Sequence, residues 1–241
     1  MKFEHTRVFN FEGALRGMRN PLNSWHLSDS AFGLCEMDYV SGYIDDVAEV
    51  WKDNGEDKRD WLTSNGIIHI DDNYCEYAFL GPKDLGLAQR LIAGGSEHRK
   101  FLRQIFVSVD ITAPLFWLKE ADTYKVATTA NSTSTMHKLA STPITAECFE
   151  MEPNDFTTNT LIPYLESLRQ EYNETKNPDT WKRLIQTLPD SWKQTRTWTG
   201  SYETVRNMCH QRVNHKLTEW RDDFMKWAAQ LPYAQEFLLT Q

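Results

Sequence analysis

The stretch Gln104-Ile105-Phe106-Val107-Ser108-Val109-Asp110-Ile111-Thr112 sets the frame for the rest of the chain. Every second residue in it is aliphatic, so one face of an extended backbone is apolar, which predicts a half-buried strand. Ala113-Pro114 follows at once, and proline is well tolerated in the first turn of a helix. We therefore predict a strand that passes directly into a helix running toward Tyr124, with the Thr112 hydroxyl as the helix cap.

Upstream of this strand, the pattern predicts one short strand and one helix. Isoleucines within 67–70, followed by a turn-forming Asp-Asp-Asn, indicate the strand. Asp84 is the expected cap of the helix, whose apolar residues recur up to Ile92. Gly94-Gly95 is expected to end it, because glycine commonly follows the last helical turn.

Downstream, the sequence predicts a loop and then mostly helices. The segment Thr128–His137 is rich in hydroxyl side chains, which favour turns over helix. Apolar residues at helical spacing predict two helices within Asp155–Leu188. They also predict one long amphipathic helix from near Ser201 to Trp227.

Length and charge limit the classes of function. The chain has 241 residues, 40% of them hydrophobic, and we expect a single domain over residues 1–241. Its net charge is −8 and it has no block of basic residues, which argues against a nucleic-acid polymer as partner. A mononucleotide needs only a few local donors, so the overall charge does not argue against it.

Cysteine spacing and hydropathy point to the cytoplasm. The four cysteines form no CxxC pair, so we expect reduced thiols rather than disulfides or a zinc site. The first residues lack the apolar core of a signal peptide, and no apolar run is long enough for a membrane span. His210 and His215 are five residues apart and fall on different helix faces, so no metal site is expected.

Two features are candidates for chemistry. On a continuous helix Arg212, His215 and Glu219 would share one sector at the margin of the apolar face. The guanidinium there would either form an ordinary salt bridge or bind a carbonyl-rich ring or an anion. The hydroxyl-rich loop, edged by Lys125 and Lys138, is either an anion cradle or a plain surface loop. Neither a Rossmann nor a P-loop motif is present.

Three segments in order resemble the flavin-dependent thymidylate synthases. They are Asp84 through Ser96-Glu97-His98-Arg99-Lys100-Phe101, then Phe106–Phe116, then Leu188-Pro189 through Arg196 and Ser201 to Arg212 and Glu219. The family signature R-H-R-x-x-S-x-N-E-x-S-x-R, carried over with one inserted residue, falls on Thr123-Tyr124-Lys125, Thr129, Asn131-Ser132, Ser134 and Met136. The likeness is clearest over residues 84–230.

The resemblance implies an α+β fold with a central, mainly antiparallel sheet flanked by helices, and a cytoplasmic homotetramer with active sites shared between subunits. It implies transfer of a one-carbon unit from methylenetetrahydrofolate to C5 of dUMP, with reduced FAD as hydride donor and NADPH as the source of reducing power. Arg212 takes the catalytic, pyrimidine-recognising place. The cofactor positions fall on His98, Tyr124, Lys125, Asn131 and Ser201.

The signature also departs from the family, chiefly in its arginines. Thr123, Tyr124 and Lys125 stand at the R-H-R positions, and Met136 replaces the arginine that would bind the substrate phosphate. Phosphate binding is therefore expected to pass to other groups, namely Ser132, Thr133, Ser134, Thr135, Lys138 and Arg183. Two alternatives follow from these changes: a flavin-dependent pyrimidine nucleotide hydroxymethylase, and a nucleotide-binding homologue without catalysis.

Overall fold

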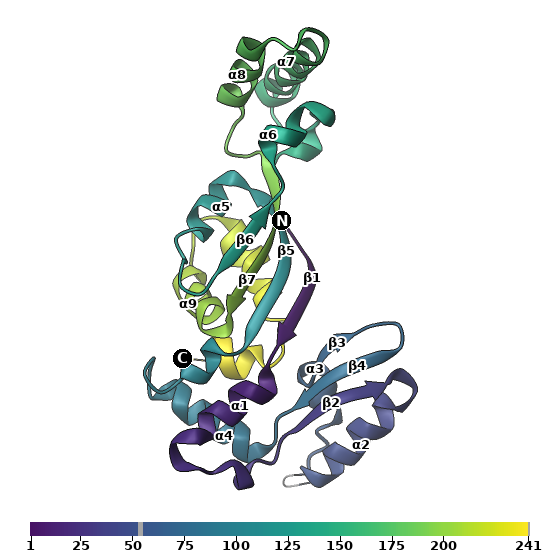
Figure 1. The fold of residues 1–241 in the computed structure, drawn as a ribbon, viewed down its shortest axis with the longest axis vertical. Coiled ribbons are helices and arrows are strands. Elements are labelled where there is room, and N and C mark those ends of the chain that lie inside the picture. Colours follow the sequence, from purple (N-terminus) through teal and green to yellow (C-terminus); the bar gives the residue numbers. More distant parts are fainter. Residues whose placement is uncertain (53–54, 241) are drawn as a thin grey trace. The chain divides into compact units, whose positions relative to one another are not determined.

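The computed structural model describes residues 1–52 and 55–240 (Figure 1). Its strands are β1 Lys2–Phe9, β2 Ala31–Glu36, β3 Ile67–Ile70, β4 Tyr74–Phe79, β5 Phe106–Pro114, β6 Thr129–Ser132 and β7 Lys193–Ser201. Its α-helices are α1 Phe11–Arg19, α2 Val40–Val50, α3 Arg59–Asn65, α4 Pro82–Ala93, α5 Leu115–Ala121, α6 Thr135–Lys138, α7 Ile162–Thr175, α8 Pro178–Thr187, α9 Tyr202–Arg212 and α10 Met225–Ala228. The π-helical turns are Thr157–Leu161, Glu219–Phe224 and Gln235–Leu239.

Two sheets organise the chain, and the expected mixed α+β class with antiparallel strands is confirmed. One sheet has the strand order β1-β5-β7-β6 and the other β2-β4-β3. In the second sheet β2 and β4 run antiparallel, with Ala31 opposite Phe79. The predicted central strand is β5. Its residues 107, 109 and 111, and residue 105 just before it, are all buried as the period of two requires.

The chain packs into two compact units, each made of several segments. Unit 1 contains Met1–Glu4, Asp110–Lys125 and Thr129–Trp198. Unit 2 contains the described residues within His5–Val109, Val126–Thr128 and Thr199–Gln241. β1, β5 and β7 each contribute residues to both units. The single-domain organisation expected over residues 1–241 stays a prediction.

Unit 1 has a small helical core. Leu165 and Leu168 of α7 and Leu184 of α8 pack with the apolar residues of the segment that follows α6, which are Leu139, Ile144 and Phe149. The two helices confirm the prediction for residues 155–188. The irregular segment after α6 therefore lies against a helix pair that holds it in place.

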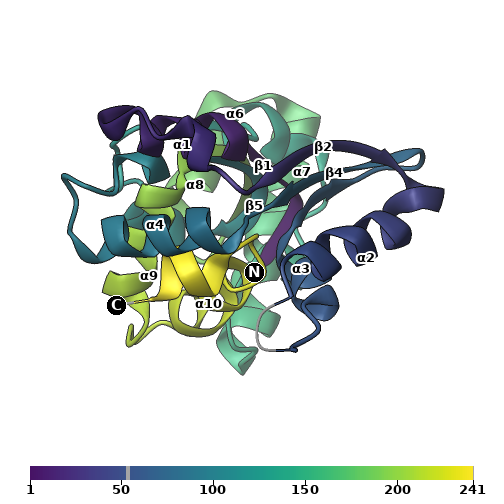
Figure 2. The same ribbon diagram turned by 90° about the horizontal axis from the view of Figure 1, so that it is seen from below.

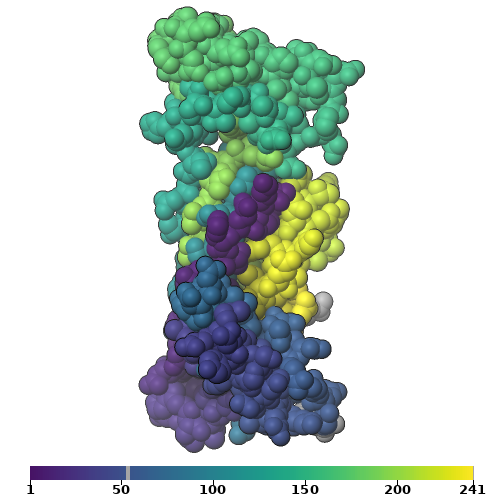
Figure 3. Space-filling model, turned by 90° about the vertical axis from the view of Figure 1, so that its right-hand side faces the viewer, coloured from purple at the N-terminus to yellow at the C-terminus, as the bar shows by residue number. Residues whose placement is uncertain are grey.

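Unit 2 contains the three-stranded sheet and the C-terminal helices. Figure 2 shows α2 and α3 on one face of this sheet, where Ile44, Leu62 and Phe79 belong to one apolar cluster. Trp227 Nε1 donates to Thr6 Oγ1 at 3.0 Å, and Figure 3 shows the C-terminal residues in yellow beside the N-terminal strand in purple. Among the described helices, none is both long and apolar enough to cross a membrane.

Both helix caps expected from local sequence are wrong. α4 begins at Pro82, not at Asp84, and the carboxylate of Asp29 accepts the backbone N–H groups of Lys83 and Asp84 at 3.0 and 3.1 Å. Asp84 is the third residue of the helix and lies in its first turn, while the predicted end at the Gly94-Gly95 pair is confirmed. A residue distant in sequence does the capping, which no local pattern reveals.

The second cap is replaced by backbone groups. β5 continues to Pro114, and Thr112 Oγ1 lies 2.7 Å from Thr195 Oγ1 on the neighbouring strand. The first N–H groups of α5, those of Leu115 and Phe116, donate to the carbonyls of Trp192 and Asp190, each at 3.0 Å. These backbone acceptors satisfy the start of the helix, so the threonine is not needed there.

Two longer elements also differ from expectation. The hydroxyl-rich segment contains β6 and α6, because threonine suits a strand and Thr133 N extends the ladder to Thr195 O at 2.9 Å. The predicted long helix ends at Arg212 and resumes as a π-helical turn at Glu219. Between them His215 Nδ1 accepts the backbone N–H of Leu217 at 3.2 Å, which competes with helical hydrogen bonding.

Candidate functional site

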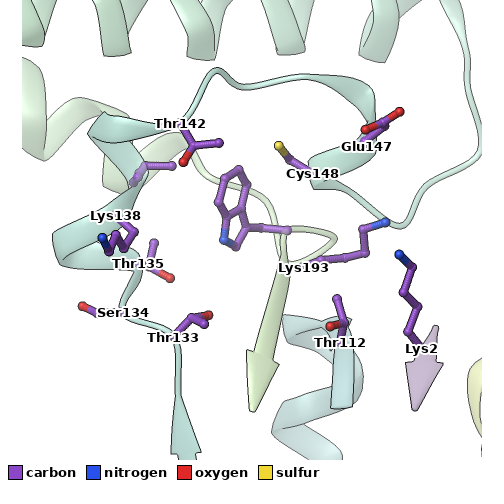
Figure 4. Close-up of a pocket in the computed structure, with 12 residues that line it drawn as sticks. Lys2, Thr112, Thr133, Ser134, Thr135, Lys138, Thr142, Glu147, Cys148 and Lys193 are labelled. Atoms are coloured by element: carbon purple, nitrogen blue, oxygen red, sulfur yellow. The ribbon is translucent and has the colours of Figure 1, made fainter. Parts of the chain in front are cut away.

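Unit 1 holds a cavity of about 580 Å³ at one end of the four-stranded sheet (Figure 4). In the order β1-β5-β7, the first residues of β1 and β7 lie beside the last residues of β5. Lys2, Thr112 and Lys193 therefore come together on three neighbouring strands. The rest of the lining is Thr133, Ser134, Thr135, Lys138, Leu139, Thr142, Glu147, Cys148 and Trp192.

The cavity is locally positive although the chain is acidic. Its lining has the ammonium groups of Lys2, Lys138 and Lys193 and one carboxylate, that of Glu147. Across residues 1–52 and 55–240, none of these three lysines is within ion-pair distance of a carboxylate. By contrast, Lys119 in the same unit contacts Asp190 at 2.6 Å. Unpaired like charges around one hollow concentrate a positive potential there, which favours an anion.

The hydroxyl side of the cavity is held by the sheet and the start of α6. Thr133 directly follows β6 and is held against β7, because its N–H donates to the Thr195 carbonyl and its own carbonyl accepts from the Gln194 side chain. The Ser134 hydroxyl accepts the backbone N–H of His137 at 3.2 Å and caps α6. The arrangement places short polar side chains opposite the lysines of β1 and β7, as Figure 4 shows.

A carboxylate on α7 fixes the cavity wall formed by residues 139–144. Glu166 accepts the backbone N–H of Ile144 at 2.8 Å and two hydrogen bonds from Arg169. Arg169 in turn donates to the carbonyl of Ala140 at 2.9 Å, and Asn173 donates to the same carbonyl at 2.8 Å. The hydrogen bonds from Arg169 and Ile144 hold the pKa of Glu166 at about 2, below its usual 4.5.

The structure brings four of the predicted substrate-binding residues to this cavity, namely Thr133, Ser134, Thr135 and Lys138. Ser132 and Asn131 lie just before them on β6, with exposed side chains. Arg183 is exposed on α8 and is not among the lining residues.

The remaining predicted site residues lie on both units. Tyr124 and Lys125 follow α5 in unit 1, half-buried and exposed respectively. In unit 2, His98 is exposed in the turn after α4. Ser201 is buried and caps α9, its hydroxyl accepting the backbone N–H of Thr204 at 3.3 Å. That hydroxyl is thus already used by the helix.

Arg212 is the last residue of α9 and is half-buried. Its guanidinium carbon lies 4.9 Å from the centre of the Trp220 ring, a cation–π distance. Because the helix ends here, the expected sector shared with His215 and Glu219 is not formed by a continuous helix. Arg212 lies over the Trp220 ring instead because the chain turns back after α9 and brings Trp220 to the guanidinium.

Sequence reasoning did not assign the lining residues outside the hydroxyl-rich loop to a site, with the exception of Lys138. Lys2 and Lys193 are the first residues of their strands, and no motif surrounds them. Only the strand order brings them to Thr112, so no local signal would have found them. The two buried thiols, Cys75 and Cys209, do not have the properties of catalytic nucleophiles. Burial raises the pKa of both, to about 12 for Cys209, and so disfavours the reactive thiolate.

Comparison with solved structures identifies the fold. The flavin-dependent thymidylate synthase ThyX of Helicobacter pylori, solved with FAD and dUMP, matches with a TM-score of 0.64 over 98% of each chain at 16% identity. The chain has the fold of a flavin-dependent thymidylate synthase. A second structure of the Helicobacter pylori ThyX with FAD and dUMP matches with a TM-score of 0.62 at 15% identity, over 99% of this chain and 97% of that one.

The likeness to ThyX extends beyond the segments that carried it in the sequence. It includes nearly all of the first eighty or so residues, where the resemblance in sequence is loose. No protein-family model matches the chain, and no curated protein matches it. In the described part of the chain, no group of three or more His, Cys, Asp or Glu side chains is arranged to hold a metal ion.

Proposed function

We propose that this chain is a divergent FAD-dependent, thymidylate synthase-like enzyme that transfers a one-carbon unit to C5 of dUMP. The fold shared with ThyX supports this, but the observation that carries the proposal is the positive cavity. Its wall is the hydroxyl-rich segment at the family's signature position, where a nucleotide phosphate is expected. Methylenetetrahydrofolate and NADPH as co-substrates, a cytoplasmic location and a homotetramer with shared sites belong to the same proposal.

The residues at the expected flavin positions differ in how well they suit FAD. His98, Lys125 and Asn131 have exposed polar side chains that fit the phosphates and ring edges of FAD, with Tyr124 as a further contact. Ser201 fits less well, because its hydroxyl caps α9. When bound, FAD supplies the hydride chemistry. The chain's own task is to orient dUMP, exclude water and polarise the pyrimidine carbonyls with Arg212.

The first test is binding by the purified protein. We expect a yellow protein with flavin absorbance, or one that gains it with added FAD, and dUMP binding that calorimetry detects. A colourless protein that takes up neither FAD nor dUMP would overturn the proposal. The mass of the product formed from dUMP, methylenetetrahydrofolate and NADPH separates methylation from the hydroxymethylase alternative, because a methyl and a hydroxymethyl group at C5 differ by one oxygen atom.

Replacing Arg212 by alanine is expected to weaken dUMP binding by about tenfold or more, because a bidentate, charge-assisted contact contributes on the order of 1.5 kcal/mol. The exposed Lys216, beyond the end of α9, gives a matched control as Lys216→Ala. Because the variant also loses the contact between Arg212 and the Trp220 ring, its thermal unfolding is measured to show that it remains folded. Equal dUMP affinity in wild type and Arg212→Ala would remove Arg212 from the site.

A catalytically inactive nucleotide-binding protein is the second candidate, and two observations favour it. Met136 has no charge at the position of the phosphate-binding arginine, and the hydroxyl at the flavin-contacting position, Ser201, serves as a helix cap. This candidate predicts dUMP binding that folate and NADPH do not change, with no product formed.

A further inference from the structure

Met136, at the position of the signature's last arginine, cannot bind a phosphate group. Met136 is 58% exposed, and a thioether offers no hydrogen-bond donor to an anion. Three ammonium groups nevertheless surround the neighbouring cavity. Lysine is a compact point charge that binds phosphate without the fixed fork of arginine, so several lysines from different elements can replace one arginine.

Lys2 and Lys193 have the better fixed positions of the three. Each begins a strand next to the central β5, and the 2.7 Å contact of the Thr112 and Thr195 hydroxyls ties β5 to β7 at this end. Lys138 instead ends the short, four-residue α6. Lys2 and Lys138 are exposed, and Lys193 is half-buried. In Figure 4 the side chains of Lys2 and Lys193 extend to the same side of the cavity.

We propose that Lys2 and Lys193 bind the phosphate of the nucleotide substrate and so take over the function of the missing signature arginine. This inference rests on the proposed function, because it assigns groups to the same substrate. The hydroxyls of Thr133, Ser134 and Thr135 bind from the opposite wall, with Lys138 as the outer charge.

Charge indicates how many phosphate groups the site takes. Three lysines and one glutamate, Glu147, give the lining a formal charge of +2. A phosphate monoester carries roughly −1.5 to −2 at pH 7, so one such group neutralises the lining. A nucleoside triphosphate would leave uncompensated negative charge, and the site is therefore expected to select monophosphates.

The test compares dUMP with deoxyuridine, which lacks the phosphate. Lys2→Gln and Lys193→Gln are each expected to raise the Kd for dUMP by about tenfold, the effect of one charge-assisted contact that is partly exposed to water. Deoxyuridine affinity should stay unchanged. Lys193→Arg should retain most of the affinity, because the charge remains. Lys182→Gln, an exposed lysine of α8 outside the cavity lining, is the matched control.

The outcomes separate this inference from the proposed function. If wild type binds dUMP and the glutamine variants bind it equally well, the lysine assignment is overturned and the proposed function stands. If the variants lose FAD and keep dUMP, the lysines bind the flavin pyrophosphate and the assignment is also overturned. If wild type binds inorganic phosphate in a Lys193-dependent way but neither dUMP nor FAD, the anion site stands and the pyrimidine substrate is excluded. Binding of none of these ligands contradicts both.

Discussion

Replacing Asp84 by alanine is expected to lower the free energy of unfolding by about 3–5 kcal/mol, the usual effect of leaving one member of a buried ion pair alone. Asp84 is 0% exposed, and its carboxylate contacts the guanidinium of Arg19, which is 5% exposed. The hydroxyls of Ser28 and Ser30 also donate to it, each at 2.6 Å. Urea unfolding of the purified variant measures the loss.

The double variant Arg19→Met with Asp84→Leu is the control for this experiment. It removes both charges together, so no buried ion is left without its partner, and we expect it to be clearly more stable than Asp84→Ala. If the free energy of unfolding of Asp84→Ala is within about 0.5 kcal/mol of the wild-type value, the range of an ordinary surface substitution, the Arg19–Asp84 pair is not buried in solution.

Glu166→Ala is expected to lower stability by about 2 kcal/mol and to weaken dUMP binding, because the carboxylate positions the wall of the cavity. The side chain is 22% exposed, so water screens part of its interaction with Arg169. Its loss removes the acceptor of the Ile144 N–H and frees the segment that contains Leu139 and Thr142. Urea unfolding and dUMP calorimetry at pH 7 measure the two effects.

The contribution of Glu166 should depend on pH in a defined direction. Its pKa in the folded protein is about 2, below the usual 4.5, so its stabilisation is complete above pH 4.5 and is lost as the pH falls toward 2. The stability gap between wild type and Glu166→Ala should therefore narrow over that window. Glu174→Gln, at an exposed position of the same helix, is the matched control. A gap that stays constant down to pH 2 contradicts the assigned pKa.

Much of the fold was predictable because its signals are local. The period of two in β5 and the helical spacing in α7 and α8 report which faces are buried, and the structure confirms them. The errors arose where a distant residue decides the outcome. The carbonyls of Trp192 and Asp190, for example, satisfy the start of α5. The break after Arg212 is an exception, because there a local hydrogen bond from the Leu217 N–H to the His215 ring competes with the helix.

The candidate site divides in the same way. Thr133, Ser134, Thr135 and Lys138 are contiguous in sequence, so composition was enough to single them out, and the structure places them on one cavity. Lys2 and Lys193 are far apart in the sequence and meet through strand order alone. A search for motifs compares neighbours along the chain and has no access to such a pairing.

The cap of α4 has a consequence for how this protein can vary. A methyl group on Gly81 would lie 2.3 Å from the backbone oxygen and side chain of Asp29, the residue that caps the helix. Positions 29 and 81 are therefore epistatic: a larger residue at 81 is tolerated only where the segment bearing residue 29 has shifted. Homologous sequences, once aligned, should show these two positions covarying.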